Sequence, residues 1–197
     1  MQVLRVAAVG GSLLVSAIAG AQGSGGVAPK KHANAPRHVS AAAPAPAAAA
    51  DSVKVNEFMS YDPTAKTVKL LLFAAHGSVN GGMNFNGASN GGSTITVPAG
   101  WSVSWSFKNE DAIPHSAIVL VNKMPFPAQP QTPAIPRAYT NDVTGGLPTN
   151  GTDQTTFTAS PAGAYVIACG VPGHAPSGMW INFVVSADAK VPSYTGK

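Results

Sequence analysis

The chain has 197 residues with a formal net charge of +4, and only 10% of its residues are charged, compared with about 25% in an average soluble protein. The excess of positive charge lies before residue 51, because residues 51–197 contain eight Lys plus Arg and eight Asp plus Glu. This balance argues against a nucleic-acid-binding surface on the second part of the chain. A single cysteine, Cys169, excludes a disulfide bond within the chain.

Residues 1–21 have the pattern of a secretory signal peptide. Arg5 precedes a short apolar run that ends at a cleavage-like site, Ala19-Gly20-Ala21. The run is short for a membrane span, and an uncleaved N-terminal anchor remains the alternative. Residues 22–50, rich in Ala, Pro and Gly, are predicted to be a disordered linker. We therefore expect residues 51–197 to be a single exported domain at the periplasmic or extracellular face of a membrane, with a membrane tether if the leader is retained.

Short apolar segments separated by turn residues follow in chain order. Residues 101–107 are the clearest, because Trp and other apolar residues alternate there with serines, as in a strand with one buried face. Residues 124–150 contain six prolines and predict a long irregular segment, and residues 191–197 predict a polar tail that frays. The expected strands lie at 53–58, 66–75, 93–97, 101–107, 117–121, 154–158, 164–169 and 179–185. This pattern predicts an all-β fold, an antiparallel Greek-key β-sandwich.

One loop combines three residues that can bind a soft metal ion. Cys169, His174 and Met179 follow one another at intervals of five residues, between two predicted strands. Each alone has an ordinary explanation: a buried cysteine, a histidine in a turn, a methionine in the core. Together, a thiolate, an imidazole and a thioether form a ligand set that suits copper, and His115 is the candidate for a further ligand.

An early histidine followed by Cys-x4-His-x4-Met before the last strand resembles the pattern of the cupredoxins, the blue copper proteins. Within them the chain resembles the sulfocyanins most. The stretch Met83-Asn-Phe-Asn-Gly-Ala-Ser-Asn90-Gly is similar to their F-N-F-N-G-x-S-N-G motif, with Met83 where that family usually has an aromatic residue. The stretch Cys169-Gly-Val-Pro-Gly-His174 adds to the likeness, which covers roughly residues 52–188.

The resemblance implies a cupredoxin-like sandwich with one type 1 copper ion. His115, Cys169 and His174 would lie near one plane around the copper, and Met179 would be a long axial ligand. The resemblance also implies that Ser116, together with Asn84 or Asn86, ties the His115 strand to the ligand loop. For the two asparagines, a role in turns is an equal alternative.

This ligand set predicts an electron carrier and not an enzyme, because four protein ligands leave no position for a substrate. We expect the carrier to be a monomer and to exchange single electrons with exported redox proteins such as cytochromes or a terminal oxidase. The edge of His174 would reach an apolar docking patch formed by Pro172, Ala175 and Pro176.

Three other functions compete with this interpretation. A copper oxidoreductase domain, as in nitrite reductases or multicopper oxidases, needs further histidine ligands, commonly as His-x-His, a pattern that this sequence does not contain. A copper carrier or chaperone usually exposes clusters of Met or His. An adhesion sandwich with an incidental cysteine would bind no copper at all.

Overall fold

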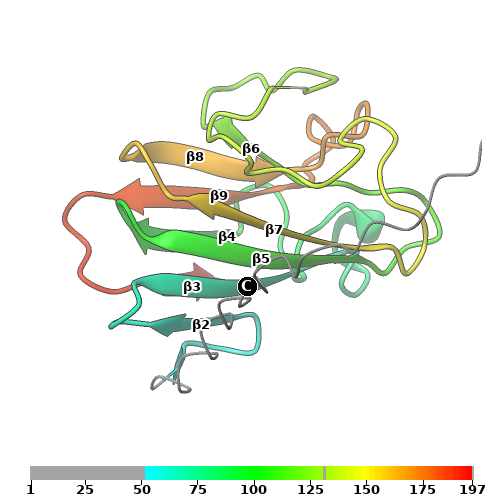
Figure 1. Cartoon of the computed structure of the whole chain (residues 1–197). Coiled ribbons are helices and arrows are strands. Elements are labelled where there is room, and N and C mark those ends of the chain that lie inside the picture. Colours follow the sequence, from blue (N-terminus) through cyan, green and yellow to red (C-terminus); the bar gives the residue numbers. More distant parts are fainter. Residues whose placement is uncertain (1–51, 131, 197) are drawn as a thin grey trace, which may run out of the picture. The chain divides into compact units, whose positions relative to one another are not determined.

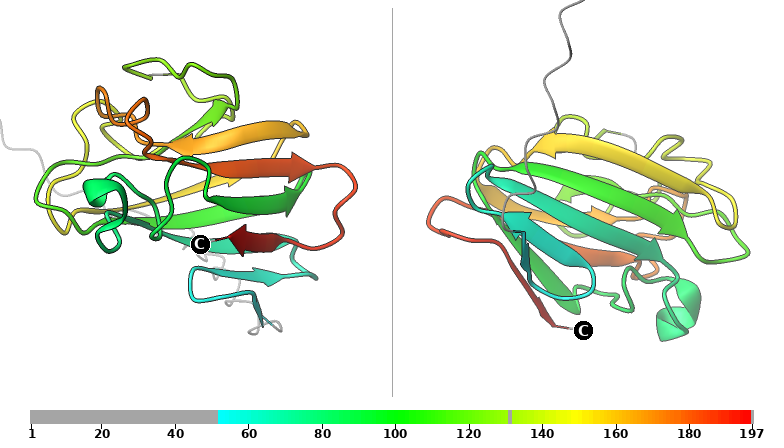
Figure 2. Two further views of the ribbon diagram at one scale, coloured as in Figure 1. Left: turned by 180° about the vertical axis from the view of Figure 1, so that it is seen from behind. Right: turned by 60° about the horizontal axis from the view of Figure 1, so that its bottom comes forward.

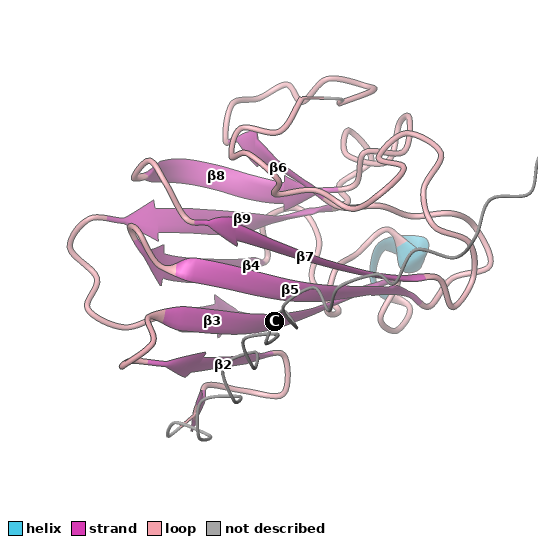
Figure 3. Ribbon diagram, in the orientation of Figure 1, coloured by secondary structure: helices cyan, strands magenta, loops and turns pink. Residues whose placement is uncertain are grey.

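The computed structural model describes residues 52–196, apart from residue 131, and shows a β-sandwich (Figure 1). The predicted signal peptide and linker lie outside the described residues. The helical structure among the described residues is one 3-10 turn, η1 (Val79–Gly82), as Figure 3 shows. The strands are β1 (Val53–Lys54), β2 (Met59–Asp62), β3 (Thr67–Ala74), β4 (Ser93–Pro98), β5 (Ser102–Asn109), β6 (Ile118–Val121), β7 (Thr152–Thr158), β8 (Gly163–Ala168), β9 (Trp180–Ser186) and β10 (Ser193–Gly196).

Two five-stranded sheets form the two layers seen in Figure 2. One has the order β1-β2-β3-β5-β7 and the other β10-β4-β9-β8-β6. The predicted β-sandwich is therefore confirmed, but its sheets are mixed. Six strand pairs are antiparallel, whereas β3 pairs with β5 and β4 pairs with β9 in parallel. Parallel neighbours need a long crossover, and the chain between β3 and β5 provides it by crossing to the other sheet as β4.

The core lies between the sheets and follows the alternation of the sequence. In β5 the side chains of Val103, Trp105 and Phe107 are buried, and in β9 those of Phe183 and its alternate neighbours are buried. Aromatic rings connect the two layers, because Phe157 on β7 lies 5.3 Å from Trp105 and 6.2 Å from Phe183 between ring centroids. Burial of this apolar surface is the main driving force for folding.

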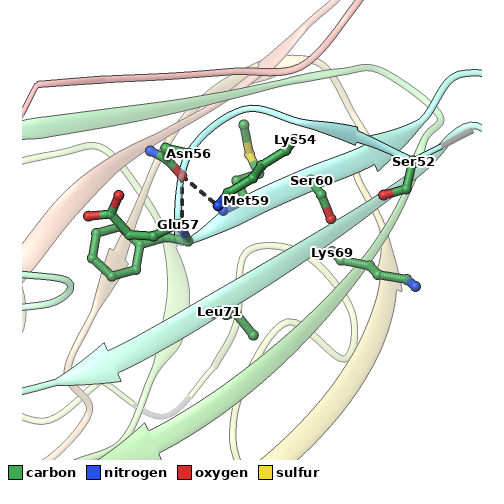
Figure 4. Close-up of a pocket in the computed structure, with 9 residues that line it drawn as sticks. Ser52, Lys54, Asn56, Glu57, Met59, Ser60, Lys69 and Leu71 are labelled. Carbon is green, nitrogen blue, oxygen red and sulfur yellow. Dashed lines mark hydrogen bonds between the residues drawn. The ribbon is translucent and has the colours of Figure 1, made fainter.

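Two predicted segments differ from the structure. The first strand is split, because the side chain of Asn56 accepts hydrogen bonds from the backbone N–H groups of Phe58 and Met59 and turns the chain before β2 (Figure 4). The prediction of a fraying C-terminal tail is wrong. Its residues form β10, which pairs with β4, and Tyr194 packs against the core.

The end of β8 and the starts of β9 and β6 lie at one end of the sandwich, on the right in Figure 1. The η1 turn lies at the same end, because Asn80 donates a hydrogen bond to the carbonyl of Ser177. The long segment after β6 is irregular as predicted, and Ala134 and Thr140 anchor it to the β6 region through backbone hydrogen bonds. Within the described residues, no helix has the length and apolar character needed to cross a membrane.

Candidate metal centre

Three of the predicted ligands meet at this end of the sandwich. Nδ1 of His115 lies 3.1 Å from Nδ1 of His174, and the Sγ atom of Cys169 lies 3.8 Å and 3.4 Å from these two nitrogens. His115 and Cys169 are fully buried, and His174 is partly exposed. No other cluster of three or more His, Cys, Asp or Glu side chains in the described part of the chain is arranged to hold a metal ion.

The size of the triangle fits a metal ion. Its centre lies about 2 Å from each of the three donor atoms, close to the ~2.0–2.3 Å at which imidazole nitrogen and thiolate sulfur bind zinc. Two imidazoles and a thiolate are also the donors that suit copper. The residues present therefore fit a single mononuclear metal ion of this kind.

His115 is held by the loop between β5 and β6. Its Nε2 atom lies 3.1 Å from Oδ2 of Asp111, and its backbone N–H and carbonyl both pair with Leu147. Burial lowers the pKa of His115, and the hydrogen bond to Asp111 opposes that shift in part. The same hydrogen bond lowers the pKa of Asp111 against the opposing effect of its burial. The pair therefore consists of a neutral imidazole and a carboxylate at neutral pH.

Cys169 directly follows β8, and its sulfur lies against Ser116. The backbone N–H of Ser116 donates to the sulfur at 3.4 Å, and the hydroxyl of Ser116 donates to the carbonyl of Val143 at 2.6 Å. That hydroxyl also accepts a hydrogen bond from the N–H of Gly170. Burial raises the pKa of the Cys169 thiol, and the N–H of Ser116 opposes this shift. Ser116 thus contacts the ligand loop through Cys169 and Gly170, and the segment after β6 through Val143.

The ligand loop folds back on itself between Cys169 and Met179. The N–H of Cys169 donates to the carbonyl of Met179, and the N–H of Met179 donates to the carbonyl of His174. Met179 is fully buried and directly precedes β9. Burial is the main cause that lowers the pKa of His174, and the nearby His115 lowers it further. These hydrogen bonds fix the backbone on both sides of His174.

Other predicted residues have different surroundings. Asn84 hydrogen-bonds to the carbonyls of Gly77 and Val79 in the turn before it, and Asn86 pairs with the backbone of β3. None of these hydrogen bonds reaches the ligand loop. Ala175 is fully buried, so the prediction that it belongs to an exposed docking patch is wrong. It packs in a small apolar cluster with Ile118 and Phe126.

Sequence reasoning missed three residues of this region. Asp111 contacts His115, Asn80 donates to the carbonyl of Ser177, and the N–H of Asn90 donates to the carbonyl of Gly178. Asn80 and Asn90 each precede two glycines, a pattern typical of turns, and this pattern was the available signal. Asp111 lies in a polar turn four residues before His115 and carries no distinguishing pattern.

Two further features, an ion-pair group and a pocket, lie outside the metal-binding cluster. His76 Nδ1 lies 2.9 Å from Oε2 of Glu110, whose other oxygen lies 3.4 Å from Nζ of Lys108. A pocket of about 350 Å³ lies beside β1, β2 and β3, and its lining includes Lys54, Ser60 and Leu71 (Figure 4). None of its lining residues belongs to the metal-binding cluster.

Comparison with known proteins places these features in a family. The family model described as the Sulfocyanin (SoxE) domain matches residues 54–196. Sulfocyanin from Sulfolobus acidocaldarius is 34% identical over 143 residues, which cover 67% of this chain and 70% of that protein. Among solved structures, reduced rusticyanin has a TM-score of 0.50 and 27% identity, covering 61% of this chain and 80% of that one. A histidine-to-methionine variant of rusticyanin has a TM-score of 0.51 and 25% identity, covering 61% and 78%.

These matches confirm the resemblance that the Asn-rich stretch beginning at Met83 and the Cys169 loop indicated. The family model covers most of the chain, and the known sulfocyanin is 34% identical over 67% of it. The chain therefore belongs to the sulfocyanin family of the cupredoxins.

Proposed function

We propose that this protein is a blue copper electron carrier. The observation that carries the proposal is the convergence of two imidazole nitrogens and one thiol sulfur, 3.1–3.8 Å apart, at a largely buried end of the sandwich. His115, Cys169 and His174 would hold the copper, and Met179 would be a further, weaker ligand. Copper bound there would supply a Cu(I)/Cu(II) couple, and hence the uptake and release of single electrons.

The surroundings of the ligands suit this role. Cys169 and Met179 are fully buried, so the protein excludes bulk water from most of the site. The backbone hydrogen bonds of the ligand loop and the contacts of Ser116 hold the donor atoms in place. A ligand set that is already in position needs little rearrangement between oxidation states, which favours electron transfer over bond chemistry.

Electrons would enter and leave beside His174. This side chain is partly exposed, and Pro172 and Pro176 on the same loop are exposed. The neighbouring loop adds Ile113, which is 43% exposed, and Pro114, which lies near Val171 of the ligand loop because both border Gly146. We propose that these apolar residues form a small docking patch for an exported redox protein, such as a cytochrome or a terminal oxidase.

The first experiment is titration of the purified protein with one equivalent of Cu(II). We expect an intense visible band from thiolate-to-copper charge transfer and a narrow hyperfine splitting in the paramagnetic resonance spectrum. Cys169→Ser should abolish both signals. His76→Ala is the matched control, because His76 pairs with Glu110 outside the cluster and should leave the spectra unchanged. A colourless copper complex of the unmodified chain would refute the proposal.

A second measurement separates the carrier from a copper oxidoreductase. We expect one copper per chain, one electron exchanged per copper, and no steady-state consumption of oxygen or nitrite in the presence of a reductant. More than one tightly bound copper together with sustained consumption would favour the enzyme. Export is part of the same proposal, and the N-terminal sequence of the secreted protein would test cleavage after Ala21.

A further inference from the structure

Among the residues that the structure describes, Asp111 is the one charged side chain that pairs with a proposed copper ligand. Its Oδ2 atom lies 3.1 Å from Nε2 of His115. An ionised carboxylate can only accept hydrogen bonds, so Nε2 must carry the hydrogen and donate it. The other ring nitrogen, Nδ1, then keeps a free lone pair, and it is this atom that faces Cys169 and His174.

The carboxylate is itself fixed in position. Its second oxygen accepts a hydrogen bond from the N–H of Ala112 at 2.6 Å. The N–H of Asp111 donates to the side chain of Asn109, and that fully buried amide also donates to the carbonyls of Ile113 and Leu147. The loop that carries Asp111 is therefore closed by Asn109 into a compact unit with His115.

The oxygen that contacts His115, Oδ2, also lies close to a glycine of the η1 turn. A Cβ atom at Gly82 would lie 2.7 Å from Oδ2 of Asp111, and the φ of this residue is +92°. A larger side chain at Gly82 would thus displace the carboxylate from His115. The close approach leaves the Asp111 side chain only partly accessible, with 25% of its surface exposed.

The charge of Asp111 has no cation to neutralise it. Within the described part of the chain, His115 is the only ion-pair partner of this carboxylate. The adjacent Glu110 differs, because His76 and Lys108 both pair with it. The two neighbouring carboxylates therefore differ in their contacts. Glu110 belongs to a surface ion-pair group, whereas Asp111 contacts the proposed metal ligand His115.

We propose that Asp111 is a positioning residue of the copper centre, which holds His115 with Nδ1 toward the metal and favours the more highly charged Cu(II) state through its carboxylate. This inference rests on the proposed function. Outer partners of metal-bound histidines orient the ring and raise its basicity. A negative charge one imidazole away stabilises the oxidised ion more than the reduced ion, so the carboxylate lowers the reduction potential.

Two substitutions separate orientation from charge. Asp111→Asn keeps an oxygen that can accept from Nε2 but removes the charge. It should shift the Cu(I)/Cu(II) equilibrium toward Cu(I) by about tenfold, or about 59 mV for one electron, through a similar loss of Cu(II) affinity, while Cu(I) affinity stays close to that of the unmodified chain. Asp111→Ala removes both effects and should lower the affinity for Cu(I) as well, by about 10–100-fold, the usual cost of losing such a partner.

Glu110→Gln is the matched control, because it removes the same charge one residue away without touching a ligand. We expect its potential and Cu(II) affinity to stay close to those of the unmodified chain. A readout without metal is the tautomer of His115 from imidazole nitrogen chemical shifts. The metal-free chain should hold the hydrogen on Nε2, and Asp111→Ala should give a mixture of tautomers.

The outcomes distinguish this inference from the proposed function. If the unmodified chain forms the blue site but Asp111→Asn and Asp111→Ala match Glu110→Gln in potential, affinity and tautomer, the role of Asp111 is refuted and the copper carrier stands. If the unmodified chain forms no blue site, the proposed function fails, and the tautomer measurement still decides whether Asp111 orients His115. Asp111→Asn is nearly isosteric, so it keeps the test available if the alanine variant does not fold.

Discussion

Ala175 lies next to His174, but its side chain points into the protein. It is fully buried against Ile118 and Phe126, whereas Pro176, the next residue, is exposed. Ala175→Glu would place an unpaired charge in this apolar cluster and should lower the free energy of unfolding by at least about 3 kcal/mol. Pro176→Glu adds the same charge on the exposed side and should change stability by less than about 1 kcal/mol.

Denaturant unfolding of both variants in the metal-free state checks this prediction. Equal stability of the two proteins would show that the Ala175 side chain is not packed as described. Slower electron exchange in Pro176→Glu, with an unchanged visible spectrum, would in addition support the proposed docking patch around His174.

At the scale of single residues, the sequence predicts the metal-binding residues better than the residues that hold them in position. Cys169, His174 and Met179 lie on one short loop, so their spacing alone brings them near each other, and His115 could be chosen by elimination. Asp111 could not be found in this way. An aspartate in a polar turn usually bonds to its own backbone, as Asp111 also does to Ala112, and only the fold brings its other oxygen to His115.

Two glycines of the ligand loop allow the effect of close packing to be separated from the effect of backbone strain. A Cβ atom at Gly170 would lie 2.7 Å from the carbonyl oxygen of Val143 and 3.1 Å from Oγ of Ser116, the hydroxyl beside Cys169. Gly173 has a φ of +82° with open space around it. One glycine is therefore required by close approach and the other only by backbone conformation.

We expect Gly170→Ala to cost about 1–3 kcal/mol through overpacking and to alter the visible and paramagnetic resonance spectra, because Ser116 must move. Gly173→Ala should cost about 1–2 kcal/mol from its left-handed backbone and leave the spectra unchanged. Unfolding curves and copper spectra of both variants test this. Identical spectra for the two would mean that Ser116 does not influence the cysteine sulfur.

At the scale of elements, alternation predicts strands but not their neighbours. The period of two in residues 101–107 and 179–185 correctly assigns the buried faces of β5 and β9. The same period is compatible with any partner, so the parallel β3–β5 and β4–β9 pairs could not be predicted. The polar composition of β10 does not predict a strand. Of its side chains Tyr194 packs against the core, and backbone hydrogen bonds to β4 stabilise the remainder of the strand.

At the scale of the whole molecule, the small number of carboxylates means that few groups can lower the stability of the fold when they become protonated at low pH. Residues 51–197 contain eight Asp and Glu, and two of them, Glu110 and Asp111, have a pKa lowered by hydrogen bonds to histidines. For Glu110 the first cause is the bond to His76, which joins the end of β3 to the end of β5. A carboxyl with a lowered pKa stabilises the folded state only while it is ionised.

The sign of the pH dependence follows from that shift. The stabilisation from Glu110 is complete above its ordinary pKa of 4.5 and is lost as the pH falls through the lower pKa of the folded state. Glu110→Gln should therefore be less stable than the unmodified chain at pH 7, and the difference should shrink as the pH falls below 4.5. Denaturant unfolding of both proteins from pH 7 to pH 3 measures it. A difference that persists undiminished at pH 3 would assign the stabilisation to packing, because packing does not depend on the charge of residue 110.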